Sequence, residues 1–164
     1  MNRARAGGEE RGAALVELAL VLPVLMLLLV GVVELGRGLY QNHILAKAAE
    51  SGARYLSREP GALDWESCAE GENWGEGVER ATRLVVFGDP FGTTDPLVPN
   101  LGTENVTIEG LGPEPISGEG MAGSPCVIRV RAAADFDPVI ATGEFLPLGD
   151  LVLRAMAEER YVGE

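Results

Sequence analysis

The sequence has few of the residues that carry most protein chemistry. It contains one histidine, His43, two cysteines, and only 5% aromatic residues. A single histidine cannot supply a His-based metal site or a set of triads, and no Gly-rich phosphate loop or Ser or Cys nucleophile signature accompanies it. A lone histidine is most often solvated surface. We therefore expect a protein that is not an enzyme and that holds no cofactor or metal.

Basic residues are also scarce. The chain has 13 Lys and Arg against 25 Asp and Glu, for a net charge of −12 and a pI near 4.5. Such a charge argues against a surface that neutralises nucleic-acid phosphates or anionic lipid headgroups, so we expect no nucleic-acid partner. A length of 164 residues allows one globular domain plus one further element.

Hydrophobic residues are concentrated near the N-terminus. The row from Leu15 to Val33 reads LVELALVLPVLMLLLVGVV, with Glu17 as its only charge. Its leucines and valines gain about 6 kcal/mol on membrane insertion, whereas one acid near the end of a span costs at most about 2.5 kcal/mol. Residues 13–33 also match the roughly 20 residues that cross the hydrocarbon core. This favours a transmembrane helix over the core helix of a soluble protein.

The flanks of the apolar run predict its orientation. Arg3, Arg5 and Arg11 precede the run, and the positive-inside rule retains such a tail in the cytoplasm. The bulk of the chain is then outside. A cleavable secretory signal peptide fits less well, because the run exceeds the usual 7 to 15 residues and no small-x-small site precedes Glu34.

Residues 11–58 resemble the N-terminal signature of TadE-like proteins, the minor pseudopilins of the Tad (Flp-type) pilus system. Gly12 is followed five residues later by Glu17, and Pro23 interrupts the apolar run. The segments GVVELGR (31–37) and ESGARYL (50–56) also match. Leu18 departs from the pattern, since the family often has an aromatic residue there.

The resemblance implies processing and partners. A prepilin peptidase would cut between Gly12 and Ala13, and Glu17 would then face the N-terminal ammonium of a neighbouring subunit. The implied partners are that peptidase, other Tad pilins and pseudopilins, the inner-membrane pilus assembly platform, and the lipid bilayer. The implied location is the bacterial inner membrane, with the bulk of the chain periplasmic and a place in the surface pilus left open. Without cleavage, Glu17 would be an acid that snorkels to the interface.

The remaining pattern predicts an α+β, pilin-like fold. The predicted organisation is a cytoplasmic leader (1–12), a transmembrane helix (13–33), its periplasmic continuation (34–58) and an extracytoplasmic head (59–164). An apolar stripe on the continuation is expected to be covered, and a small antiparallel sheet is expected to pack on it. The stripe comprises Leu35, Leu39, Asn42, Ala46, Ala49, Ala53 and Leu56. A second helix is predicted at 77–87, strands are predicted at 105–109, 126–132 and 151–159, and most of the Gly- and Pro-rich segment 88–125 is predicted as loop. Alternation predicts opposite faces within two of these strands: Ile128 and Val130 against Arg129 and Arg131, and Leu151, Leu153 and Ala155 against Val152, Arg154 and Met156.

The two cysteines suit an oxidising periplasm. A disulfide between Cys68 and Cys126 would close a loop of about 59 residues and stabilise the fold by roughly 4 kcal/mol in the chain-entropy model. Two unpaired thiols remain the alternative. The sequence also leaves calcium binding open at the acidic pairs Asp89 and Asp95 or Asp135 and Asp137, although dense ligand spacing is lacking.

The preferred interpretation is a TadE-like minor pseudopilin that assembles or primes a Tad pilus. The alternative is an uncleaved, single-pass, membrane-anchored periplasmic binding or adhesion protein. A membrane-anchored hydrolase is the least favoured, because the nucleophile signatures are lacking.

Overall fold

The computed structural model describes residues 6–92, 95–112, 126–138 and 151–163. The chain divides into two compact units, one up to Arg37 and one from Gly38 onward. The first helix, α1 (Ala6–Leu56), supplies all of the described first unit and continues into the second. The second unit also contains helix α2 (Trp74–Phe87) and a short 3₁₀ helix, η1 (Thr103–Asn105).

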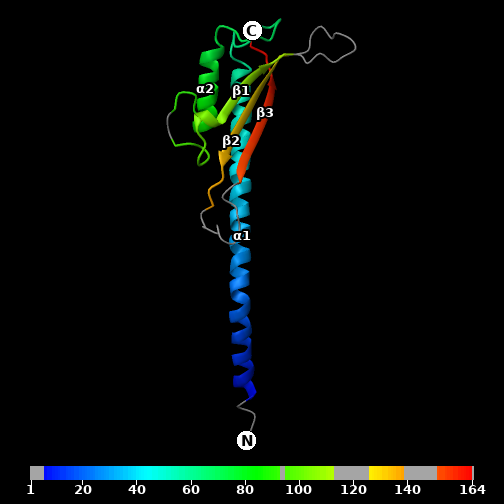
Figure 1. The fold of residues 1–164 in the computed structure, drawn as a ribbon, viewed down its shortest axis with the longest axis vertical. Helices are drawn as coiled ribbons and strands as arrows, with labels where there is room; N and C mark the ends of the chain where they lie inside the picture. The colour runs from blue at the N-terminus through cyan, green and yellow to red at the C-terminus, as the bar shows by residue number, and fades with distance from the viewer. Residues whose placement is uncertain (1–5, 93–94, 113–125, 139–150, 164) are drawn as a thin grey trace, which may run out of the picture. The chain divides into compact units, whose positions relative to one another are not determined.

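Three strands complete the second unit (Figure 1). They are β1 (Val106–Leu111), β2 (Val127–Asp135) and β3 (Val152–Arg160), arranged in the order β1-β2-β3 with both neighbouring pairs antiparallel. The predicted α+β fold, with a small antiparallel sheet on the long helix, is confirmed. All three predicted strands exist with bounds shifted by one to three residues, and α2 begins three residues before the predicted start. Residues 113–125 of the predicted loop lie outside the described ranges.

Side-chain alternation determines which face of the sheet meets the helix. Ile128 and Val130 of β2 are fully buried, whereas Arg129 and Arg131 lie on the other face. In β3, Leu153 is buried and Met156 is exposed. These alternations agree with the sequence prediction, because successive side chains of a strand point to opposite faces. The apolar face packs on α1, and together they form the core of the second unit.

The covered stripe of α1 differs from the predicted one. Ala49, Ala53 and Leu56 are fully buried, as predicted, but Leu35 and Leu39 are 65% and 64% exposed. Leu45 is buried instead. The covered face is therefore rotated around α1, toward Gly38, Leu45 and Ala48. Apolar character alone cannot distinguish two neighbouring stripes, whereas small side chains decide where another element can approach closely.

Gly52 is where α2 approaches α1 most tightly. A Cβ atom at this position would lie 2.4 Å from the Cγ2 atom of Val85 and 3.3 Å from the carbonyl oxygen of Ala81. Gly52 is therefore a contact residue, because a larger side chain would not fit between the two helices without a shift.

The disulfide between Cys68 and Cys126 is present, which confirms the sequence prediction. A turn leads into it: the Asp64 carboxylate accepts hydrogen bonds from the hydroxyl and the backbone N–H of Ser67, at 2.6 and 2.8 Å. These bonds, first the one from the hydroxyl, lower the pKa of Asp64. The Asp64 carboxylate of this turn therefore stays ionised at a lower pH than the carboxylate of a free aspartate does. Cys68 follows with a φ of 56°, in the left-handed region.

The end of α1 is satisfied by a distant segment. The backbone carbonyl of Ser57 accepts hydrogen bonds from the N–H groups of Val162 and Gly163, at 2.8 and 3.0 Å. The Tyr161 hydroxyl donates to the carbonyl of Glu59 at 3.1 Å, and Tyr161 is 1% exposed. The residues that follow β3 thereby close the C-terminal end of the helix, where carbonyl groups otherwise lack partners.

Replacing Gly52 by alanine should destabilise the second unit by about 1 to 3 kcal/mol, because the added methyl group overpacks the contact with Val85. Urea unfolding of the detergent-solubilised chain, followed by the fluorescence of buried Trp74, measures this. Val85→Ala in the same chain should restore part of the loss. Gly36→Ala is the matched control, since a Cβ there meets nothing within 4 Å. Equal effects of the two glycine substitutions would contradict this packing.

Reduction of the disulfide should lower the free energy of unfolding by about 4 kcal/mol, because the unfolded chain regains the entropy of its closed loop. Non-reducing peptide mapping should first recover Cys68 joined to Cys126. Unfolding with and without reductant then gives the loss, and a Cys68→Ser, Cys126→Ser double variant should match the reduced protein. Free thiols at both positions in exported protein would refute the pairing.

Candidate membrane-anchoring and processing site

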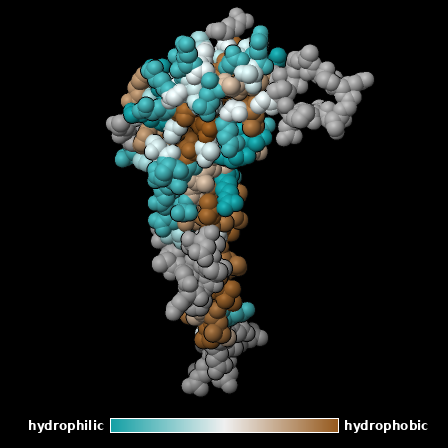
Figure 2. All heavy atoms as spheres, turned by 45° about the horizontal axis from the view of Figure 1, so that its top comes forward, coloured by the Kyte–Doolittle hydropathy of each residue, from teal (hydrophilic) through white to brown (hydrophobic). Residues whose placement is uncertain are grey.

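The N-terminal part of α1 is long and apolar enough to cross a membrane. An 18-residue window has a mean hydropathy of 2.8, and none of that window is buried against other described residues. Its large side chains, including Leu20 at 73% and Val32 at 69%, are exposed. The space-filling view shows this stretch as a hydrophobic surface (Figure 2). Soluble proteins rarely expose so large an apolar surface, and the helix is consistent with a single-pass anchor or a pilin.

Pro23 lies inside the helix without ending it. Proline has no backbone N–H, so the carbonyl of Ala19, four residues earlier, loses its usual helical donor. Transmembrane helices tolerate this loss because neighbouring helices or local adjustments can satisfy the freed carbonyl. The interruption predicted at Pro23 is therefore a missing hydrogen bond within a continuous helix.

Gly12 and Ala13 lie within α1, six and seven residues after its start. A Cβ atom at Gly12 would meet nothing within 4 Å. Packing within the described part of the chain therefore gives no reason for a glycine here. Gly7 and Gly8 also belong to this first part of the helix, and each glycine weakens a helix by up to about 1 kcal/mol relative to alanine. The peptide bond after Gly12 thus lies in a helical segment that three glycines weaken.

Glu17 is exposed, and it has no hydrogen bond or ion pair with any residue in the described ranges. Its helical neighbours one turn away are Ala13 and Val21, so no cation lies on its own stripe. Glu34 and Arg37 offer a contrast on the same helix, because their side chains pair at 2.7 Å. Glu17 thus lacks a local partner among the described residues, whereas Glu34, the next acid along the helix, has one.

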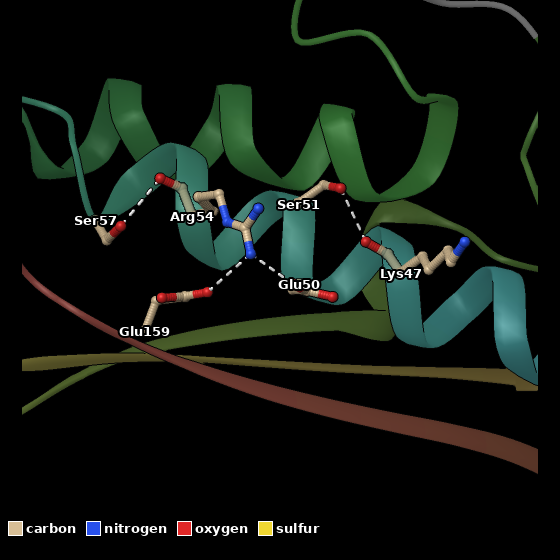
Figure 3. Close-up of polar contacts among 6 residues, drawn as sticks. All are labelled: Lys47, Glu50, Ser51, Arg54, Ser57 and Glu159. Carbon is tan, nitrogen blue, oxygen red and sulfur yellow. Dashed lines mark hydrogen bonds and ion pairs between the residues drawn. The ribbon is translucent and has the colours of Figure 1, made fainter.

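Several charged groups of the second unit form structural pairs. Arg54 on α1 reaches Glu50 on the same helix at 2.5 Å and Glu159 on β3 at 3.5 Å (Figure 3). Arg80 on α2 pairs with Glu76 and also reaches Glu59 at 3.6 Å. The contacts with Glu159 and Glu59 join neighbouring segments, whereas the other two each lie within one helix. At the surface each contributes less than about 1 kcal/mol. None of them includes a nucleophile.

Residues considered for chemistry from the sequence do not come together. His43 is exposed on α1, and the Asp89 carboxylate accepts a hydrogen bond from the backbone N–H of Phe91. Across the described residues, no group of three or more His, Cys, Asp or Glu side chains could hold a metal ion. Calcium binding and the expected lack of an enzymatic activity therefore stay sequence predictions.

Comparisons with known proteins bear on one part of the chain. A family model described as TadE-like protein matches residues 12–54, about a quarter of the sequence. Curated proteins and solved structures give no match. The matched segment begins at Gly12, includes Glu17, and extends along α1 into the second unit. The match confirms, over residues 12–54, the resemblance to TadE-like proteins that the sequence motifs predict.

Proposed function

We propose that this chain is a TadE-like minor pseudopilin that takes part in assembling or priming a Tad-type surface pilus. It is inserted in the bacterial inner membrane with its N-terminus cytoplasmic, and a prepilin peptidase cleaves it between Gly12 and Ala13. The observation that carries the proposal is the carboxylate of Glu17, which stands without a described partner on an exposed apolar helix, five residues after Gly12.

Cleavage would account for the glycine at position 12, which no packing contact within the described residues requires. The peptidase is an intramembrane aspartyl protease by family resemblance, and it must bring its carboxyl groups against the scissile backbone. Because the bond lies inside a helix, the helix must also open locally. Gly12 assists both steps, since it has no side chain and weakens the helix.

Cleavage would also create a positive charge with which the Glu17 carboxylate can pair. A new ammonium group would form at Ala13, near the same end of the apolar run. In a low-dielectric environment an isolated carboxylate is costly, and a cation nearby lowers that cost steeply. The pairing of Glu17 with the ammonium of a neighbouring subunit would then couple processing to assembly, because only cleaved subunits offer the cation.

Gly12→Leu should block processing, because the side chain obstructs access to the scissile bond. Intact mass of protein extracted from membranes should show wild-type chains beginning at Ala13 and Gly12→Leu chains retaining the leader. Gly31→Leu is the matched control, as a Cβ there also meets nothing within 4 Å, and it should be cleaved normally. A wild-type chain that still begins at Met1 would favour the uncleaved, anchored binding or adhesion protein.

Glu17→Gln should separate processing from assembly. The leader should still be removed. Membrane insertion should improve slightly, because the span no longer contains an acid. Surface pili should fall by at least about tenfold, since each loss of about 1.4 kcal/mol in a subunit contact is a factor of ten. Pilus counts beside Glu50→Gln, an acid on the same helix outside the apolar run, provide the control. Wild-type pilus numbers in Glu17→Gln cells would reject the pairing.

A further inference from the structure

Among the residues that the structure describes, strand β3 is a free edge of the sheet, since β2 pairs with it on one side and no described strand pairs with it on the other. The carbonyl of Leu151 accepts from the N–H of Phe136, and the N–H of Tyr161 donates to the carbonyl of Cys126, both at 2.8 Å. Backbone groups alternate along an antiparallel strand, so odd-numbered residues face β2 and even-numbered residues face away. The outward set is Val152, Arg154, Met156, Glu158 and Arg160.

This edge lacks several of the usual obstacles to strand addition, although it carries charged side chains. Proteins protect edge strands by making them short or by adding charged residues, especially lysine, proline or a bulge. β3 is nine residues long, contains neither proline nor lysine, and pairs with β2 through nine consecutive register partners without a bulge. The other edge strand, β1, has six residues and contacts α2. Figure 1 shows β3 at the side of the sheet away from α2.

The exposed face beside this edge carries unbalanced charge. Both outward arginines of β2 are paired, Arg129 with Glu158 at 2.6 Å and Arg131 with Glu109 at 3.0 Å. Arg154 and Arg160 of β3 have no ion pair with any residue in the ranges that the structure describes. Between them Met156 is 61% exposed. In a chain of net charge −12, the edge strand thus presents two available cations around an apolar centre.

We propose that the free edge of β3 binds an extended segment of another protein, which adds to the sheet as a fourth, antiparallel strand. The segment carries carboxylates opposite Arg154 and Arg160, hence six residues apart, and an apolar residue opposite Met156. Main-chain hydrogen bonds to the outward residues provide the affinity, and the facing charges select the partner and its register. This interaction does not depend on cleavage after Gly12.

Disulfide tethering tests the proposal on the full-length chain in detergent. Met156→Cys supplies an exposed thiol, while the native cysteines are at most 8% exposed. The probe is a nine-residue β-forming peptide with cysteine opposite position 156 and glutamates opposite Arg154 and Arg160. In a mild thiol buffer it should tether about tenfold more than the same peptide with two lysines, because two cross-strand charge pairs change sign.

Two controls separate strand pairing from simple charge attraction. N-methylation of the peptide amide opposite Glu158, which faces β3 in the proposed register, should remove the advantage, whereas N-methylation of the next amide should not. Arg154→Gln should weaken tethering of the acidic peptide about threefold. Arg83→Gln on α2, with the same change in net charge, should leave it unchanged.

Equal tethering of the acidic and basic peptides, or insensitivity to both N-methylations, would overturn the proposal. Disulfide-linked dimers of Met156→Cys that form in preference to tethering would overturn the stated partner and identify a second copy of this chain as the occupant. None of these results bears on the removal of the leader, so the proposed function stands or falls separately.

Discussion

The apolar run of α1 is the constraint on which the rest of this protein depends. Its leucines and valines have no cover in the described chain, and water is a poor environment for them. Under the proposed function, lipid or the helices of other subunits supply that cover, and charges near the run then interact in a low-dielectric environment. Glu34 and Arg37 pair along the helix, whereas Glu17 has no partner among the described residues.

The second half of α1 meets the opposite requirement, because it is enclosed by protein. Figure 3 shows α2 on one side of the helix and the sheet on the other. Small residues make this possible: Gly52 admits α2, while Ala49 and Ala53 are fully buried. One continuous helix therefore changes from large exposed apolar side chains in its first half to a buried face rich in small residues in its second half.

Much of the fold was predictable because it follows local rules. Alternation along β2 and β3 predicted both their existence and their buried faces, and a chain with two cysteines allows only one internal pairing. The covered stripe was predicted poorly, since Leu35 and Leu39 are as apolar as Leu45 and only the path of α2 and the sheet distinguishes them. The role of Gly52 and the free edge of β3 were not predicted, because both depend on the order of elements in space. Gly12 and Glu17 were recognised by spacing, and their roles in cleavage and pairing stay predictions.

The contacts of residues 161–163 with the end of α1 also constrain how the head is made. Tyr161 belongs to the core, and the Ser57 carbonyl meets its partners more than a hundred positions later in the chain. Contacts so distant in sequence form late, because a large loop must close first. Under the orientation proposed above, the head cannot complete its core until residues 161–163 have crossed the membrane. The segment in transit then remains unfolded, and Cys68 can pair only after Cys126 has reached the same side.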